Sequence, residues 1–417
     1  MSPAPREMPL NPYFEANLPQ RNRKATAWRT VFQVSTTIGM IALVLLLYTI
    51  VNEIFGMVAI DNKVDPSSLA VNGVPIEKLD QATLISIIQS NVSKGKFRQL
   101  EREKPLAERT WEEVYQVVID DVVQPTDIVG TWTLVESLTR KDEILAKVEQ
   151  EHPQATVKFT SWITPKFITS PQSSDVLSAG VRTALLGSIY IIIITIMVAL
   201  PIGMGAAIYL EEYASDNWLN RAIQTNINNL AGVPSIIYGM LGLAIFVRML
   251  EPLTSGTLFG ITDPTTANGR TILSASLTLA LLVLPLLIIN VQEAIRTVPN
   301  SIREGSYGLG ATKWQTIWHH ILPNAMPGIL TGSILSVSRA MGETAPLVVI
   351  GAATYITFDP SGPFSKFTTL PIQIYQWTSR AQGEYHNIAA AAILVLLVLL
   401  LSLNATAILL RNRYARR

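Results

Sequence analysis

The sequence contains no cysteine, which excludes disulfide bonds, thiolate catalysis and cysteine-bound metal sites. Charge is also scarce, because only 15% of the 417 residues are charged and the net charge is +1, so nothing implies a nucleic-acid partner. A Gly-x-x-x-x-Gly-Lys-Ser/Thr phosphate loop is absent, which excludes ATP hydrolysis by that route. None of the four histidines has metal-ligand spacing with carboxylates; they are His152, His319, His320 and His386. We therefore expect no metal or other cofactor bound to this chain.

The sequence is rich in long apolar runs. Hydrophobic residues make up 49% of the chain and gather in six runs, each long enough to cross a bilayer as a helix. The first run is too long for a signal peptide and is followed by no small-residue cleavage site, so we expect it to be retained. We predict an all-α integral membrane protein with six transmembrane helices. The runs are 30–58, 178–209, 222–250, 271–292, 326–353 and 387–410.

Basic residues at both ends of the chain predict its orientation. They precede the first run at 21–29 and follow the last at 411–417, so the positive-inside rule places both termini in the cytoplasm. The short inner loop 211–221 fits less well, because it is mainly acidic. The predicted parts are a cytoplasmic tail at 1–28 with a disordered start, a first membrane helix at 29–58, an outer insert at 59–177, a five-helix core at 178–411 with an inner loop at 293–325, and a basic tail at 412–417.

The outer insert is large enough to fold as a small domain. Helical spacing occurs over Ile76–Gln89, Glu112–Asp121 and Leu134–Gln150, whereas Thr156–Thr160 alternates like a strand. We expect a small α+β or mostly helical module between the first two membrane helices. It shows no catalytic constellation, and its simplest role is a spacer or a docking platform.

The inner loop 293–325 carries strong helix signals. Ser301–Glu304 and Thr312–Gln315 each fit a capping box, and Gly308–Gly310 between them suits a break. The second helix would pass through Trp314 and Trp318, which share one face, and end at Pro323. An interfacial linker with good caps would explain these features without any further role.

A polar stripe runs along the fifth apolar run. Gly332, Ser336, Arg339 and Glu343 follow one another at helical intervals, and Pro346 should then kink or end the helix. A charge at the centre of a membrane helix costs about 2.5–3.5 kcal/mol on insertion scales. The two charges therefore form either a structural ion pair or a contact with a polar cargo.

The third run repeats small and polar residues at helical spacing. They are Asn228, Gly232, Ser235, Gly239 and Gly242. We favour close helix packing as their role. Asn228 and Ser235 are also candidates to face a pathway, and Pro234 should bend this helix.

The chemistry of the charged pair favours one kind of cargo. A guanidinium donates paired N–H bonds to phosphate-like oxygens, whereas an ionised carboxylate only accepts. Arg339 with Glu343 therefore suits an anion that still bears a proton, as phosphate does near neutral pH and sulfate does not. This argument does not distinguish phosphate from other protonated anions as the cargo.

Two stretches resemble a known family. Glu304-Gly305-Ser306, Gly310 and Leu322-Pro323 are spaced as in the coupling loop of ABC-type import permeases, although small residues replace two alanines and His320 replaces an isoleucine. Arg339–Leu347 is similar to a signature of the membrane subunits of phosphate ABC importers. Three further stretches share this similarity, which covers about 175–411 and not the insert; they are Gly232–Gly239, Gly310–Trp314 and Leu370–Tyr375.

The resemblance implies a type I ABC importer permease fold and a non-catalytic role. It implies a sister permease, a pair of ATPase subunits that hold ATP and Mg²⁺, and an outer phosphate-binding protein, all at a bacterial plasma membrane. The residues implied for ATPase coupling are Glu304, Gly305, Ser306, Gly310, Trp314, Leu322 and Pro323. Those expected along the phosphate pathway are Arg339, Glu343, Ser336, Thr344, Asn228 and Ser235.

The sequence is also compatible with two other functions. A gradient-driven anion transporter would need no ATPase, but such folds often contain inverted repeats, and we find no convincing one. A membrane receptor would sense through 59–177, but it needs an output domain, and the longest inner segment is the loop 293–325.

Overall fold

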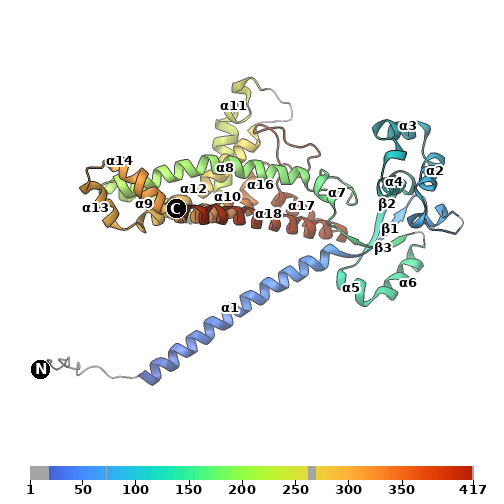
Figure 1. Ribbon diagram of the computed structural model, residues 1–417, viewed down its shortest axis with the longest axis horizontal. Helices are drawn as coiled ribbons and strands as arrows, with labels where there is room; N and C mark the ends of the chain where they lie inside the picture. Colours follow the sequence, from blue (N-terminus) through green and yellow to red (C-terminus); the bar gives the residue numbers. More distant parts are fainter. Residues whose placement is uncertain (1–17, 72, 154, 262–268, 416–417) are drawn as a thin grey trace. The chain divides into compact units, whose positions relative to one another are not determined.

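The computed structural model describes residues 18–71, 73–153, 155–261 and 269–415, and most of these residues are helical (Figure 1). The chain divides into two compact units, residues up to 51 and residues 52–417, which are described separately. Among the described residues, five helices are long and apolar enough to cross a membrane, or six if one bent pair counts as a span. The predicted helical membrane class is confirmed.

The first long helix differs from the predicted span at both ends. Helix α1 covers Leu18–Ile54, so residues 18–28 of the expected tail are helical, whereas residues 1–17 lie outside the described residues. The segment 20–28 consists mainly of good helix formers and contains neither glycine nor proline. The apolar run continues to residue 58, but its last four residues belong to strand β1 (Phe55–Asn62).

The insert is an α+β module around a three-stranded antiparallel sheet. Strand β1 lies in the centre, between β2 (Pro125–Thr131) and β3 (Thr156–Ser161). The predicted strand and helical stretches are present, whereas β1 and β2 were not predicted. The helices are α2 (Gln81–Asn91), α3 (Lys94–Glu103), α4 (Trp111–Val117) with the π-turn η4 (Val118–Val123), α5 (Leu134–Thr139), α6 (Lys141–Glu151) and α7 (Pro165–Thr169).

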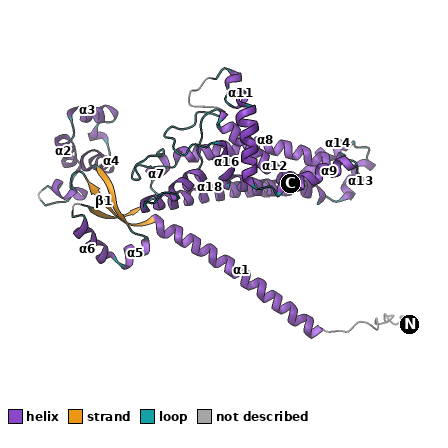
Figure 2. Cartoon of the chain, turned by 180° about the vertical axis from the view of Figure 1, so that it is seen from behind, coloured by secondary structure: helices purple, strands orange, loops and turns teal. Residues whose placement is uncertain are grey.

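Long helices form the membrane core and lie side by side in both views (Figure 1, Figure 2). Helix α12 packs against α8 and α15, and α18 packs against α15 and the short α17. Their bounds are α8 Arg182–Ile208, α12 Ile272–Arg296, α15 Leu322–Gly342, α17 Leu370–Thr378 and α18 Gly383–Ala415. Helix α8 continues into the π-turn η5 (Tyr209–Tyr213).

The third apolar run is bent, as Pro234 predicted. Helix α9 (Trp218–Ala231) and the helical segment Ser235–Met249, formed by α10 (Ser235–Gly242) and η6 (Leu243–Met249), meet at an angle of 106°. Two glycines of α10 allow close packing. A Cβ at Gly239 would lie 2.6 Å from the Cα of Pro346, and one at Gly242 would lie within 2.8 Å of three side-chain atoms of Thr278. Packing therefore explains these two small residues.

The insert and the inner loop lie at opposite ends of this helical core. The insert sheet adjoins the start of α8 and of α18, whereas α13 (Asn300–Gly308) and α14 (Lys313–Thr316) lie at the far end of α12 and α15 (Figure 1). Between α10 and α12, the chain forms the short turns α11 (Glu251–Thr254) and η7 (Thr257–Phe259).

Candidate functional site

The predicted charged pair lies where a membrane helix is broken. Helix α15 ends at Gly342, Glu343 is extended with ψ 113°, and α16 (Ala345–Ile350) begins with Pro346 in its first turn. Proline is tolerated there because the first helical N–H groups have no intrahelical partner. The break expected near Pro346 is therefore present, and it places Glu343 just beyond the end of α15.

Arg339 and Glu343 form an ion pair at this break. Nε of Arg339 lies 3.5 Å from Oε1 of Glu343, and the two side chains are 45% and 20% exposed. Neighbouring residues on the same surface are apolar, because Leu335 is 64% exposed and Val348 is 46% exposed. A guanidinium on an apolar surface at membrane depth is costly unless water, a ligand or another protein covers it. The pair is therefore accessible from outside this chain.

The other two residues of the polar stripe, Gly332 and Ser336, pack inside the protein. Ser336 is 2% exposed, and its hydroxyl donates to the carbonyl of Gly332 at 3.0 Å. A Cβ at Gly332 would lie 2.5 Å from that of Asn290 in α12. Thr344 is half-buried at the start of α16, and its side chain makes no cap hydrogen bond there. The structure thus separates Ser336 from the accessible surface that holds Arg339.

Asn228 and Ser235 lie on different helices, because the bend falls between them. Asn228 is exposed on α9 and accepts a hydrogen bond from Gln224 at 3.2 Å, while Gln224 also pairs with Gln292 of α12. Ser235 is half-buried as the first residue of α10, the helix whose Gly239 packs against Pro346. The third run therefore reaches the broken helix through α10, whereas α9 presents separate polar side chains.

The inner loop forms two helices, but two predicted details are wrong. Helix α13 begins at Asn300 after Pro299, so Ser301 and Glu304 do not form the predicted capping box. Pro323 does not end the second helix, because the helix continues through the π-turn η9 (Ile317–Ile321) into α15. The wider hydrogen-bonded ring of a π-turn gives room for a proline that would clash in a regular α-helix.

The turn between these helices agrees with the sequence. Gly310 has φ +86°, a conformation that glycine adopts without steric cost, and Thr312 and Gln315 form the predicted capping box. Ser306 is buried, and its hydroxyl lies 2.9 Å from that of Thr316. Two of the residues expected to couple to an ATPase therefore shape the turn itself.

The remaining residues of the loop divide into a buried and an exposed group. Leu322 is 5% exposed and belongs to a core cluster with α12. Glu304, Gly305 and Pro323 are exposed, as is Leu309. Trp314 and Trp318 stack with ring centroids 5.6 Å apart, and each is more than half exposed. The loop thus carries two stacked tryptophans that the rest of this chain leaves exposed.

Sequence reasoning missed the ion pairs that hold this loop. Arg303 of α13 bonds Glu212 of η5 at 2.8 Å, and Arg296 bonds Glu211 at 2.6 Å. Lys313 donates to the carbonyl of Glu212 at 2.7 Å. The sequence did contain a signal for these pairs, because the acidic loop 211–221 and the basic loop 293–325 are predicted on the same side of the membrane. These pairs explain the acidic residues of the loop 211–221.

The helical core and the broken helix are those of a multi-pass membrane protein. The chain belongs to the family of binding-protein-dependent transport system inner membrane components, whose model matches residues 199–416. It is thus an ABC importer permease subunit.

Several relatives are similar to about half of this chain or more. The probable ABC transporter permease YqgI of Bacillus subtilis is 32% identical over 58% of this chain and 81% of its own length. The phosphate transport permease PstA of Mycobacterium leprae is 35% identical over 54% of this chain and 69% of its own. The phosphate transport permease PstC of Pasteurella multocida is 33% identical over 49% of this chain and 66% of its own. A solved bacterial ABC transporter for alginate has a chain that is 16% identical with a TM-score of 0.43, over 77% of this chain and 99% of that one.

Proposed function

We propose that this chain is a PstA-type permease subunit that forms half of the translocation pathway of an ATP-driven inorganic phosphate importer. The observation that carries this proposal is the Arg339–Glu343 pair, which lies at a helix break and on a surface that this chain leaves uncovered. Family relatives with phosphate transport names support the same cargo.

The pair offers complementary groups to a protonated anion. The guanidinium of Arg339 donates N–H bonds to two oxygens of phosphate, and Glu343 accepts a hydrogen bond from the O–H group that monohydrogen phosphate still carries. At 3.5 Å the two side chains neutralise each other without a short bond, so an entering anion can separate them at modest cost. Sulfate has no proton near neutral pH and would leave Glu343 facing an oxyanion.

The complete transporter would contain three kinds of partner. A PstC-type sister permease covers the exposed surface around Arg339, and a PstB-type ATPase dimer with ATP and Mg²⁺ binds the inner loop. A PstS-type phosphate-binding protein docks outside. Glu304, Gly305, Gly310, Trp314 and Pro323 are the accessible members of the proposed coupling surface. Ser306 and Leu322 support that surface from within.

This arrangement fixes the orientation of the chain. Both termini and the inner loop would lie in the cytoplasm of a bacterial cell, with the insert outside the plasma membrane. Arg21, Arg23, Lys24 and Arg29 in α1 support this orientation, as does Arg411 in α18.

The test is phosphate-dependent ATP hydrolysis and phosphate uptake by the complex in proteoliposomes. Arg339→Gln and Glu343→Gln should each reduce uptake by about tenfold or more, because each removes a charge-assisted contact. The matched control is Arg248→Gln, since Arg248 is another exposed arginine of a membrane segment and lies in η6. The control should transport normally, and all variants should assemble with equal yield.

Three results would contradict the proposal. Full uptake in both pair variants would remove Arg339 and Glu343 from the pathway. Uptake driven by an ion gradient without ATP would indicate a gradient-driven anion transporter. Sulfate uptake equal to phosphate uptake would exclude the proposed recognition of the proton.

A further inference from the structure

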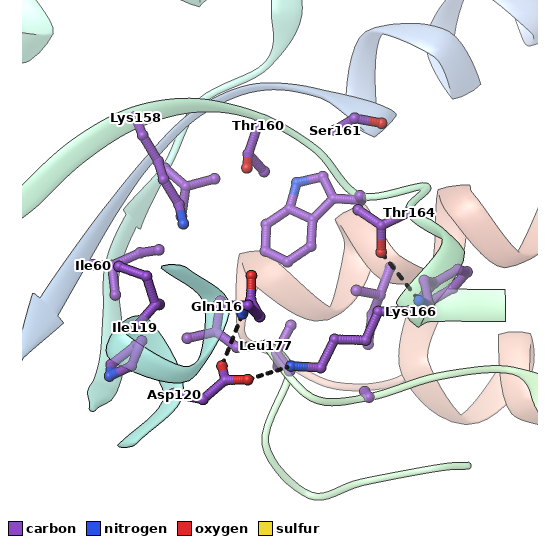
Figure 3. Close-up of a pocket in the computed structure, with 17 residues that line it drawn as sticks. Ile60, Gln116, Ile119, Asp120, Lys158, Thr160, Ser161, Thr164, Lys166 and Leu177 are labelled. Atoms are coloured by element: carbon purple, nitrogen blue, oxygen red, sulfur yellow. Dashed lines mark hydrogen bonds and ion pairs between the residues drawn. The ribbon is translucent and has the colours of Figure 1, made fainter. Parts of the chain in front are cut away.

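A cavity of about 260 Å³ lies where the insert meets the membrane core (Figure 3). One wall comes from β1 and β3 of the sheet, and a second comes from α4 and η4. The third is formed by the segment 176–179 before α8 and by Ile388 of α18. The cavity thus lies between the insert, the segment that leads into α8, and α18, and it is separate from the Arg339–Glu343 pair.

Three hydrogen-bond donors line this cavity from β3 and from the residue that follows it. Lys158, Thr160 and Trp162 alternate along the chain, so their side chains point to the same side of the sheet. Figure 3 shows the Lys158 side chain reaching from the strand towards Gln116. Among the described residues, no hydrogen bond to another protein group engages the amine of Lys158, the hydroxyl of Thr160 or the indole nitrogen of Trp162. These donors are therefore available to a ligand.

The cavity carries one uncompensated positive charge. Lys166 forms an ion pair with Asp120 at 3.5 Å, and Gln116 donates to the same carboxylate at 2.9 Å, so these groups balance one another (Figure 3). Lys158 is an exposed residue at the mouth of the cavity, and partial desolvation of its amine by the surrounding protein lowers the pKa of Lys158. Asp120 and Glu77 oppose that change only from a distance. An unpaired ammonium in such a place gains free energy from an anion.

Apart from Ser161 and Thr164, the rest of the lining is apolar. Ile60, Ile119, Leu177 and Ile388 face the same cavity as the three donors. The volume lies near the lower end of the range for small-molecule sites, about 300 Å³. It exceeds what a small inorganic ion fills. The ligand should therefore combine one charged end with an apolar body.

We propose that this cavity binds a small monocarboxylate with an apolar body, whose carboxylate contacts Lys158, Thr160 and Trp162. A single positive charge matches a monoanion, whereas a dianion would meet the carboxylate of Asp120 without a second free cation among the cavity residues. The apolar body lies against Ile60, Leu177 and Ile388. A bound ligand then contacts the insert and α18 at once. This site is independent of phosphate as the transported anion.

Binding is tested on the full chain in lipid nanodiscs by isothermal titration with phenylacetate. We expect saturable binding that is weaker by about tenfold or more for the neutral isostere phenylacetamide, because a charged hydrogen bond is lost. Lys158→Met should weaken phenylacetate binding by a similar factor. Lys141→Met is the matched control, since Lys141 is an exposed lysine of α6 outside this cavity, and it should bind normally.

Two conservative variants keep the proposal testable if Lys158→Met fails to fold. Thr160→Val and Trp162→Phe each remove one donor and preserve most of the packing, and each should weaken binding by about threefold or more. The proposal is wrong if wild-type protein shows no saturable binding of phenylacetate. It is also wrong if phenylacetamide or inorganic phosphate binds as well as phenylacetate, or if all three cavity variants bind as wild type.

Discussion

The carboxylate of Glu212 lies 2.8 Å from the guanidinium of Arg303, although 91 residues separate the two in the chain. Their side chains are only 7% and 17% exposed. Arg303 also donates to the carbonyls of Ile295 and Val298. This pair therefore fastens the first helix of the inner loop to the end of α8, and it determines where the loop presents its exposed face.

Breaking this pair should destabilise the protein far more than breaking its exposed neighbour. Glu212→Gln leaves a largely buried guanidinium without its counter-charge, and we expect a loss of roughly 3 kcal/mol in the free energy of unfolding. Glu211→Gln is the matched control, because its partner Arg296 is 61% exposed, and the loss should be below about 1 kcal/mol. Chemical unfolding in detergent micelles measures both. Equal losses would contradict the assigned role of Glu212.

The close approach of α10 to α16 gives a second prediction. Gly239→Ala places a methyl group 2.6 Å from the Cα of Pro346, so the backbone of one helix must move. We expect a cost of about 1–3 kcal/mol, as for other overpacked sites. Gly205→Ala in α8 meets nothing within 4 Å, and it should stabilise the helix by about 0.5–1 kcal/mol. Thermal unfolding would contradict the packing if Gly239→Ala were as stable as Gly205→Ala.

Of the two glycines Gly308 and Gly310 in the inner loop, only Gly310 should lower the stability of the protein when it is replaced by alanine. Gly310→Ala must adopt φ +86°, which costs about 1–2 kcal/mol although the surrounding space is open. Gly310→Asn should cost less, because asparagine tolerates this conformation. Gly308→Ala lies in the last turn of α13 with open space around it, and it should be neutral or slightly stabilising. A comparison of the three melting temperatures is the measurement, and the reverse order would refute the backbone argument.

The two stacked tryptophans should matter for assembly more than for stability. Trp314 and Trp318 are 58% and 54% exposed, so replacing both by alanine removes little buried surface from this chain. We expect the double variant to unfold like the wild type but to lose the ATPase subunit during co-purification, because central aromatic residues dominate many interfaces. Trp218→Ala, which changes another tryptophan that is 75% exposed, should keep the ATPase. Retention of the ATPase by the double variant would exclude this face as the docking site.

Features that depend on local chemistry could be predicted from the sequence. The long apolar runs predicted helices because a helix satisfies its backbone hydrogen bonds within a single segment, as the interior of a bilayer requires. Pro234 marked a bend, and Thr312 with Gln315 marked a helix start, because each acts on its own neighbours. Arg339 and Glu343 were expected on one helical face because four residues separate them, and their side chains lie 3.5 Å apart.

Features that depend on distant residues could not be predicted. Phe55–Val58 continues an apolar run, and only its pairing with β2 and β3 makes it a strand. Pro323 signals a helix end, but the preceding π-turn accommodates it. The partners of Glu211 and Glu212 lie far along the chain, as do the three donors of the cavity relative to its other walls. Spacing in one segment carries no information about such contacts.

The uninterrupted helix from Lys313 to Gly342 has a mechanical consequence. It contains 30 residues, which corresponds to about 45 Å, and it carries the stacked tryptophans near one end and Arg339 near the other. A twist or tilt imposed at the tryptophans reorients the guanidinium through the hydrogen bonds of a single rod. In the proposed importer, a movement of the docking face would therefore reach Arg339 along this one helical segment, without any separate linkage between the two sites.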